Sequence, residues 1–396
     1  MEQKITKVQE LLQKEKVDGW LLYDFQKRNP LAIDFLQIGA EVHLTRRLFY
    51  WIPAVGDPVK IVHATEVHVV EHLPGIVKVY FQWQTLEEIL QEILKKSKCI
   101  AMEYSPRNAI PSISYVDGGT LDVIRETVPN VISSHVFLQP FLCLLTCKQR
   151  KQHLEAASVL DDTVSLTWKY ISSQLKTDKP VTEYDVQQFM VAEIERQGCM
   201  LEGQPICAVN ANSSNPHYSP TKEQHSIIQK GDFILIDLWC KKKEEGAVFA
   251  DISRVAVADV KPTVRQQEIF SIVYEAQKKA TEVLREKCAK KELAKGYELD
   301  QAARGVIEKA GYASYFIHRT GHNIYTKDHG PGAHLDSIET WDDRPLLPKT
   351  CFSIEPGIYL REEFGVRLEY DVYITEDFQV EVSGGIQRDI ITLLSF

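Results

Sequence analysis

Two stretches of the chain, 231–257 and 351–374, each carry two acidic residues inside apolar sequence that has the pattern of a β-hairpin. The first hairpin is expected to turn at Lys242–Gly246 and the second at Arg361–Gly365. The acids are Asp237 and Asp251 in the first stretch and Glu355 and Glu369 in the second. A fold that contains these hairpins must compensate the charge of their acids, and this requirement constrains the structure more than any other feature.

The spacing of the acids predicts how they lie in each hairpin. The interval from 237 to 251 equals the interval from 355 to 369, and each pair is symmetric about its expected turn. Symmetric residues of an antiparallel hairpin face each other, with Cβ atoms ~4.5–5.5 Å apart on one side of the sheet. Each hairpin is therefore expected to present two carboxylates side by side.

Bare carboxylates that close together, among Phe, Ile, Leu and Trp, would be unfavourable because burial of unpaired charge is costly and like charges repel. A shared proton would relieve the repulsion within a pair, and a cation would relieve it better. Four hard oxygen donors suit two bridged metal ions ~3.5–4 Å apart. The alternative is a solvated strand face, which fits Glu369 but not Asp237, whose strand is apolar on both faces.

A histidine-rich stretch lies between the two hairpins. It contains His318, His322 and His329, and His217 precedes it in the segment Ser-Asn-Pro-His-Tyr-Ser-Pro. A neutral imidazole is a common ligand of catalytic transition metals, and further histidines can bind a developing oxyanion. The alternative interpretation is a set of ordinary loop histidines.

Length, charge and cysteine usage narrow the class of protein. A chain of 396 residues is longer than one core usually holds, which favours two domains. The net charge of −9 disfavours nucleic acid or an anionic membrane as a partner, and no signal or membrane-spanning segment is expected. The eight cysteines are scattered without a CxxC pair, which is typical of reduced thiols and predicts a cytoplasmic protein.

The order of the expected elements predicts an α/β (α+β) protein. The first ~140 residues alternate helical and strand-like patterns without a phosphate-binding glycine loop or a nucleophile elbow. Longer helices are expected over 149–175, Thr182–Gln197, 263–288 and 298–310, with strands between them. Pro140 and the polar run that follows it predict a boundary, which gives domains 1–145 and 146–396.

The ordered set of two aspartates, a histidine and two glutamates resembles the pita-bread metallopeptidases, a superfamily that includes methionine aminopeptidase, aminopeptidase P, prolidase and creatinase. The matching motifs are Leu235-Ile-Asp237-Leu, Asp251-Ile-Ser-Arg, Gly321-His322, Ser353-Ile-Glu355-Pro-Gly-Ile-Tyr359 and Gly365-Val-Arg-Leu-Glu369. The resemblance covers about 150–396 and implies a pita-bread catalytic domain. Residues 1–145 resemble the smaller N-terminal domain of the aminopeptidase P, prolidase and creatinase branch.

The resemblance implies a site with two divalent ions, with manganese expected and cobalt, zinc or iron also compatible. It assigns as metal ligands Asp237, Asp251, His322, Glu355 and Glu369. Glu355 would also move a proton from the nucleophile, a hydroxide bridging the metals, to the leaving nitrogen. His217, His318 and His329 would bind the scissile carbonyl and its neighbours, and Tyr359 and Arg367 would support the site.

The implied function is hydrolysis of a peptide bond next to proline in a short peptide, as an Xaa-Pro aminopeptidase or dipeptidase and as a homodimer. Two alternatives stay open: a hydrolase of a small amide or amidine, as creatinase is, and a non-catalytic binding module. Related sequences usually place glycines after the ligand histidine, where this chain has Asn323 and Tyr325. This difference leaves the shape of the loop and the fit of the substrate open.

The position four residues after His329 bears on the length of the substrate. Many small microbial prolidases have an arginine there, suited to a substrate carboxylate, whereas this chain has Ala333 and no basic residue between Lys327 and Arg344. Xaa-Pro-Yaa peptides are therefore expected to be cleaved at least as well as Xaa-Pro dipeptides. The alternative is that Arg367, the N-terminal domain or a partner subunit supplies the anchor.

Overall fold

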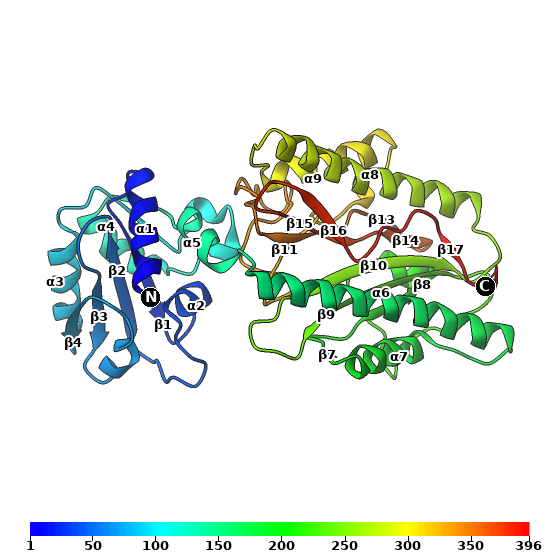
Figure 1. The fold of residues 1–396 in the computed structure, drawn as a ribbon, viewed down its shortest axis with the longest axis horizontal. Helices are drawn as coiled ribbons and strands as arrows, with labels where there is room; N and C mark the ends of the chain where they lie inside the picture. The colour runs from blue at the N-terminus through cyan, green and yellow to red at the C-terminus, as the bar shows by residue number, and fades with distance from the viewer. Residues whose placement is uncertain (396) are drawn as a thin grey trace. The chain divides into compact units, whose positions relative to one another are not determined.

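A computed structural model describes residues 1–395 and divides the chain into two compact units, Met1–Leu142 and a second unit that begins at Cys143 (Figure 1). No helix within residues 1–395 has both the length and the apolar character needed to cross a membrane. All eight cysteines are free thiols.

The first unit is built on one six-stranded mixed sheet with the strand order β4-β3-β2-β1-β5-β6. Its strands are β1 (Gly19–Phe25), β2 (Arg47–Pro53), β3 (Val59–His63), β4 (Ile76–Tyr80), β5 (Cys99–Met102) and β6 (Asn130–Ser133). Its helices are α1 (Glu2–Lys14), α2 (Pro30–Leu36), α3 (Trp83–Leu94), α4 (Gly118–Thr127) and α5 (His135–Leu142). The predicted alternation of helices and strands in this unit is confirmed.

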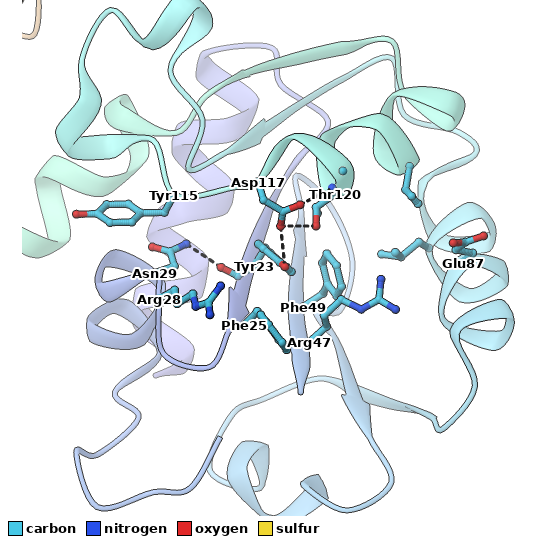
Figure 2. A pocket seen from close by; sticks show the side chains of 13 residues that line it. Tyr23, Phe25, Arg28, Asn29, Arg47, Phe49, Glu87, Tyr115, Asp117 and Thr120 are labelled. Atoms are coloured by element: carbon cyan, nitrogen blue, oxygen red, sulfur yellow. Dashed lines mark hydrogen bonds between the residues drawn. The ribbon is translucent and has the colours of Figure 1, made fainter. Parts of the chain in front are cut away.

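A cavity of about 480 Å³ lies within this first unit, with aromatic walls that include Phe49 and Tyr115 (Figure 2). Asp117 projects into it and accepts hydrogen bonds from the Tyr23 hydroxyl at 2.9 Å and the Thr120 hydroxyl at 2.8 Å. The Asp117 carboxylate is therefore already hydrogen-bonded to neighbouring side chains of the chain.

Glu103, one of the buried acids of the first unit, is surrounded by hydrogen-bond donors. Oε1 accepts from Trp20 Nε1 at 2.6 Å and from the Ser134 hydroxyl at 3.1 Å. Oε2 accepts from the Asn29 amide at 2.9 Å and from the Tyr23 backbone N–H at 3.4 Å. Burial still dominates and raises the pKa of Glu103 to about 7, because desolvation of a carboxylate outweighs these donors.

The second unit contains three sheets between two pairs of helices (Figure 1). One sheet has the order β17-β10-β9-β7, with β8 also on β9; another has the order β11-β12-β15-β16; and β13 pairs with β14. The strands are β7 (Cys199–Met200), β8 (Ile206–Val209), β9 (Phe233–Lys242), β10 (Ala250–Val257), β11 (Asn323–Ile324), β12 (Cys351–Ile354), β13 (Gly357–Leu360), β14 (Phe364–Arg367), β15 (Tyr370–Ile374), β16 (Val380–Ser383) and β17 (Ile391–Thr392).

The long helices of this unit begin where the sequence supplies side-chain caps. They are α6 (Cys147–Lys176), α7 (Glu183–Arg196), α8 (Val264–Ala289) and α9 (Gly296–Lys309). Thr146, Thr182 and Thr263 each form a capping box with the residue three positions later. The predicted helices are all present, within a few residues at their ends.

The two faces of β9 and β10 belong to two different cores. Even-numbered residues of these strands, such as Ile236 and Ile252, pack with residues of α6 and α7. Odd-numbered residues, such as Leu235 and Val255, pack with residues of α8, α9 and β12–β15. Because side chains alternate along a strand, the odd-numbered acids Asp237 and Asp251 point toward the second of these layers.

Candidate metal centre

The pairing of β9 with β10 differs from the sequence prediction. Asp237 lies opposite Ser253, and Asp251 lies opposite Trp239, so the two aspartates are diagonal neighbours and do not face each other directly. They still share a face of the sheet. The predicted register was wrong because the connection between the strands is centred one residue later than expected, and an error of one residue in the centre of a turn shifts the pairing by two.

The second acidic pair follows the predicted register. β12 pairs Ile354 with Tyr370, and β13 pairs Gly357 with Arg367, and extension of this register places Glu355 opposite Glu369. Neither glutamate belongs to a strand, because the ladder is interrupted at Pro356, which has no N–H to donate. The Glu369 backbone instead donates to Ser253 O on β10, at 3.3 Å, and this bond joins the two sheets.

Ser253 lies between the two acidic pairs. Its hydroxyl oxygen is 2.5 Å from Asp237 Oδ1 and 2.8 Å from Glu369 Oε2, and it accepts from Arg367 Nε at 2.8 Å. One hydroxyl hydrogen can serve only one of the two carboxylates at a time. Arg367 also forms an ion pair with Asp237 at 2.5 Å. The negative charge of Asp237 is therefore balanced by the positive charge of Arg367.

His322 faces the remaining carboxylates. Its Nε2 atom is 3.3 Å from Glu355 Oε1 and 3.6 Å from Asp251 Oδ2, and only 2% of the residue is exposed. Gly321 holds the preceding turn against β12, where a Cβ atom would lie 2.1 Å from Ser353 O. Burial lowers the pKa of His322 well below its ordinary value, which keeps the ring neutral and a lone pair available.

The other three predicted histidines line the same pocket, which has a volume of about 740 Å³. His329 stacks near His322 with 4.0 Å between the ring centroids, and its Nδ1 atom lies 3.0 Å from Arg319 Nη2. A guanidinium can only donate, so Nδ1 accepts and the neutral ring carries its hydrogen on Nε2. His217 contributes to the wall as an exposed residue.

His318 has both ring nitrogens engaged. Nδ1 lies 2.7 Å from the Arg319 carbonyl oxygen and therefore donates, whereas Nε2 accepts from the Tyr359 hydroxyl at 2.7 Å. Tyr359 in turn accepts from Arg367 Nη1 at 3.2 Å. Burial, followed by the charge of Arg367, lowers the pKa of His318 to about 3, so this ring is also neutral.

Buried carboxylate oxygens without hydrogen-bond partners concentrate at this site. They are Asp251 Oδ1, Asp328 Oδ1, Glu369 Oε1 and, directly behind them, Asp371 Oδ1. Burial and then the charge of the neighbouring acids raise the pKa of Asp251 and of Glu369 well above the ordinary range. Asp251, His322 and Glu369 also bring ligand atoms within 4.8 Å of one another. A buried set of oxygen donors with one neutral imidazole fits divalent cations.

Two pocket residues were missed by the sequence analysis. Asp328 directly precedes His329, and its Oδ2 atom is 3.7 Å from His329 Nε2, so it groups with His322 and His329 as a further possible cation-binding set. Arg319 directly follows His318 and also lines the pocket. Their adjacency to histidines that were already singled out was the available signal, but no spacing rule distinguishes them from surface charges.

The two residues that replace the expected loop glycines do not line the pocket. Asn323 is buried, and its side chain accepts from the Gly332 N–H at 2.9 Å and donates to Cys351 O at 2.9 Å. The Tyr325 hydroxyl accepts from the Gln149 amide of α6 at 3.4 Å. Asn323 therefore braces the loop that carries Asp328 and His329, and neither substitution fills the pocket.

Comparison with known proteins connects this geometry to a family. The model of Metallopeptidase family M24 matches residues 152–376, more than half of the chain. A Xaa-Pro dipeptidase of Lactobacillus helveticus is 38% identical over 184 residues, which cover 46% of this chain and 45% of that protein. The chain thus aligns with about half the length of the curated relatives that it matches.

Solved structures extend the likeness in fold to nearly the whole chain. A dipeptidase PepE from Mycobacterium ulcerans has a TM-score of 0.70 at 19% identity and covers 99% of this chain and 97% of that one. A prolidase from Thermococcus sibiricus has a TM-score of 0.64 at 22% identity, with coverages of 99% and 98%. These matches confirm the predicted two-part α/β architecture.

Proposed function

The chain belongs to Metallopeptidase family M24, and from this premise we propose that it hydrolyses the peptide bond next to proline in short peptides, as a Xaa-Pro dipeptidase or aminopeptidase. The observation that carries this proposal is the set of unpartnered, buried carboxylate oxygens around a neutral His322. Such oxygens would be strongly destabilising in a binding module that holds no cation. They support an enzyme of the pita-bread class with its metal set intact.

We assign the metal ligands as the resemblance implies: Asp237, Asp251, His322, Glu355 and Glu369. These residues would hold two divalent ions, and manganese is the metal that we expect. Bound divalent ions supply Lewis acidity and lower the pKa of water enough to provide a nucleophile near neutral pH.

Glu355 is the proposed proton carrier. In the metal-free chain burial raises its pKa to about 7, against the opposing charges of Arg367 and Arg319, and a bound cation would lower this pKa and keep the carboxylate ready to accept a proton. The Ser353 hydroxyl donates to Glu355 Oε1 at 3.1 Å and orients it. A proton taken from the attacking water can then reach the leaving nitrogen through this residue.

The pocket histidines have separate proposed roles. His329 can donate its Nε2 hydrogen to the substrate carbonyl as negative charge develops there, because Arg319 occupies Nδ1. His217 also lines this pocket, and we assign it to binding of the substrate. His318 holds Tyr359, which joins it to Arg367 and Asp237, so we assign it to positioning within the substrate-binding wall.

Metal analysis combined with a peptide panel tests the proposed function. The purified chain should contain about two divalent ions after loading and exhaustive dialysis, and it should cleave Xaa-Pro or Xaa-Pro-Yaa peptides but not the matched peptides with alanine in place of proline. Cleavage of creatine-like amidines instead of peptides would contradict the proposal. A homodimeric, cytoplasmic enzyme is the associated expectation, which sedimentation and cell fractionation can check.

A further inference from the structure

We infer that Arg319 binds the carboxylate of a substrate that ends directly after the scissile bond, so that the enzyme prefers dipeptides to longer peptides. This inference rests on the proposed function and specifies its substrate. It reverses the expectation from the sequence that no local carboxylate anchor exists.

Arg319 differs from the other buried or half-buried arginines of the second unit because, in the described part of the chain, its guanidinium forms no ion pair with a carboxylate. Six other arginines of this unit are buried or half-buried, and each forms an ion pair with a carboxylate: they are Arg150, Arg254, Arg265, Arg304, Arg344 and Arg367. Arg319 is half-buried as well, yet within residues 1–395 its guanidinium makes no ion pair. Desolvation of a guanidinium without an acid is costly, so its position in a pocket points to a ligand with negative charge.

The backbone of Arg319 is fixed while most of its guanidinium stays free. Its N–H donates to Glu339 Oε1 at 3.2 Å, and its carbonyl accepts from His318 Nδ1 at 2.7 Å. The guanidinium makes one hydrogen bond, from Nη2 to His329 Nδ1 at 3.0 Å. A guanidinium has five N–H donors in a planar fork, so enough remain for a bidentate carboxylate.

Within residues 1–395 no carboxylate accepts a hydrogen bond from this guanidinium, although its charge acts on Glu355 in the same pocket. Asp328 Oδ2 lies 3.7 Å from His329 Nε2, whereas the Arg319 guanidinium contacts Nδ1 of the same ring. The exposed Glu339 accepts its hydrogen bond from the Arg319 backbone N–H and not from the guanidinium. The positive charge therefore faces the pocket next to the histidine that we assign to the scissile carbonyl.

The distance along a peptide fits this placement. In a dipeptide the terminal carboxylate belongs to the residue that follows the scissile bond, and one residue spans ~3.8 Å. A group that is in direct contact with His329 is within reach of that carboxylate while His329 holds the carbonyl. In a tripeptide the same position is occupied by a neutral peptide carbonyl, which gains less from a guanidinium than a carboxylate does.

Matched substrates separate an anchoring role from an indirect role through His329. Wild type, Arg319→Met and Arg319→Lys are compared on Xaa-Pro, its C-terminal amide and Xaa-Pro-Yaa, with Arg388→Met on the exposed surface as the control. Wild type should favour the dipeptide over its amide by tenfold or more in kcat/KM. Arg319→Met should slow all three substrates through His329 and should reduce the dipeptide-to-amide ratio toward one, and Arg319→Lys should restore part of that ratio.

The outcomes distinguish the two proposals. If wild type cleaves the amide or the tripeptide as well as the dipeptide, or if Arg319→Met lowers all three substrates by one common factor, the inference is overturned while the proposed function stands. If wild type binds no metal and cleaves no proline peptide, the proposed function itself fails. Metal content and melting temperature of Arg319→Met, measured beside the control, show whether the variant is folded and loaded.

Discussion

Glu103 in the first unit and the pair Asp251 and Glu369 in the second are all buried carboxylates, but their surroundings differ. Glu103 receives four hydrogen bonds, two on each oxygen. Asp251 and Glu369 each keep one oxygen that accepts nothing. A buried acid with a structural role has hydrogen-bond donors of the chain around both oxygens. Asp251 and Glu369 instead keep lone pairs to which no donor of the chain is bonded. Vacant lone pairs therefore indicate function more directly than burial or a raised pKa, which both sites share.

Replacement of Asp251 should produce the largest effect. Asp251→Asn is expected to lower kcat/KM at least ~10³-fold, since it removes a charged donor from the metal set and metal chemistry contributes several kcal/mol. In the metal-free protein the same change should not lower the melting temperature, because it removes one of several mutually repelling charges. Calorimetry and steady-state kinetics measure the two effects. A metal-free variant that melts well below wild type would mean that Asp251 is structural, as Glu103 is.

His329→Ala should separate substrate chemistry from metal binding. Loss of one group that stabilises the developing charge slows turnover by ~10²–10⁴. Metal content should stay near the wild-type value, since His322 and the carboxylates remain. Elemental analysis beside kinetics checks both expectations. An empty metal site in this variant would place His329 among the ligands.

Glu103 is expected to affect the pH dependence of the unfolding free energy and not the catalytic activity. Its pKa of about 7 in the folded chain lies above the ordinary value of 4.5, so between these values the folded state holds a proton that the unfolded state has lost. Stability should therefore fall as pH rises from about 4.5 to about 7 and then level off, by roughly 3 kcal/mol for a shift of this size. Urea unfolding at pH 5 and pH 8 measures the fall.

Glu103→Gln is the variant that tests this pH dependence, because its amide has nearly the same shape as the carboxyl group and cannot ionise. The difference in unfolding free energy between pH 5 and pH 8 should shrink by that amount, and kcat/KM should stay within a few-fold of wild type. An unchanged pH slope would show that the four donors already hold Glu103 ionised throughout.

Metal loading should stabilise the folded chain through the acidic residues of the metal centre alone. Free metal at a hundred times its dissociation constant stabilises the folded state by ~2.7 kcal/mol per site. The gain should be present in Glu103→Gln and lost in Asp251→Asn, as thermal unfolding with and without chelator can show. Equal stabilisation of both variants would place the bound metal elsewhere.

The features that depend on the local sequence pattern, such as the positions of the long helices, could mostly be predicted from the sequence. The helices α6, α7 and α8 were predicted to within a few residues, α7 from its threonine cap, and in the structure each of the three begins at a threonine cap. The register of Glu355 and Glu369 followed from a symmetric turn, while that of Asp237 and Asp251 was missed because nothing local fixes the centre of a longer connection. Two-residue strands such as β7 carry too little pattern to be recognised.

The remaining parts of the site depend on contacts between distant segments. Ser253 bridges the acidic pairs only because β10 meets Glu369, and these residues are far apart in the chain. Arg319 was not predicted as an anchor because only the residues after His329 were considered for this role. In the folded chain Arg319, which precedes His329, contacts the His329 ring. A single charged residue has no periodicity, so its partner, or the absence of one, is visible only in three dimensions.

The bond from the Glu369 N–H to Ser253 O also has a consequence for the order of events during synthesis. A ribosome releases β10 well before β12–β15, so the nascent chain passes through a stage in which Asp237 and Asp251 exist without their glutamate counterparts. Contacts of such long range close late in folding because loop entropy must be overcome first. Cation capture by the complete set is therefore deferred until the last strands have docked, and a chain truncated before residue 369 would retain the first acidic pair without a finished site.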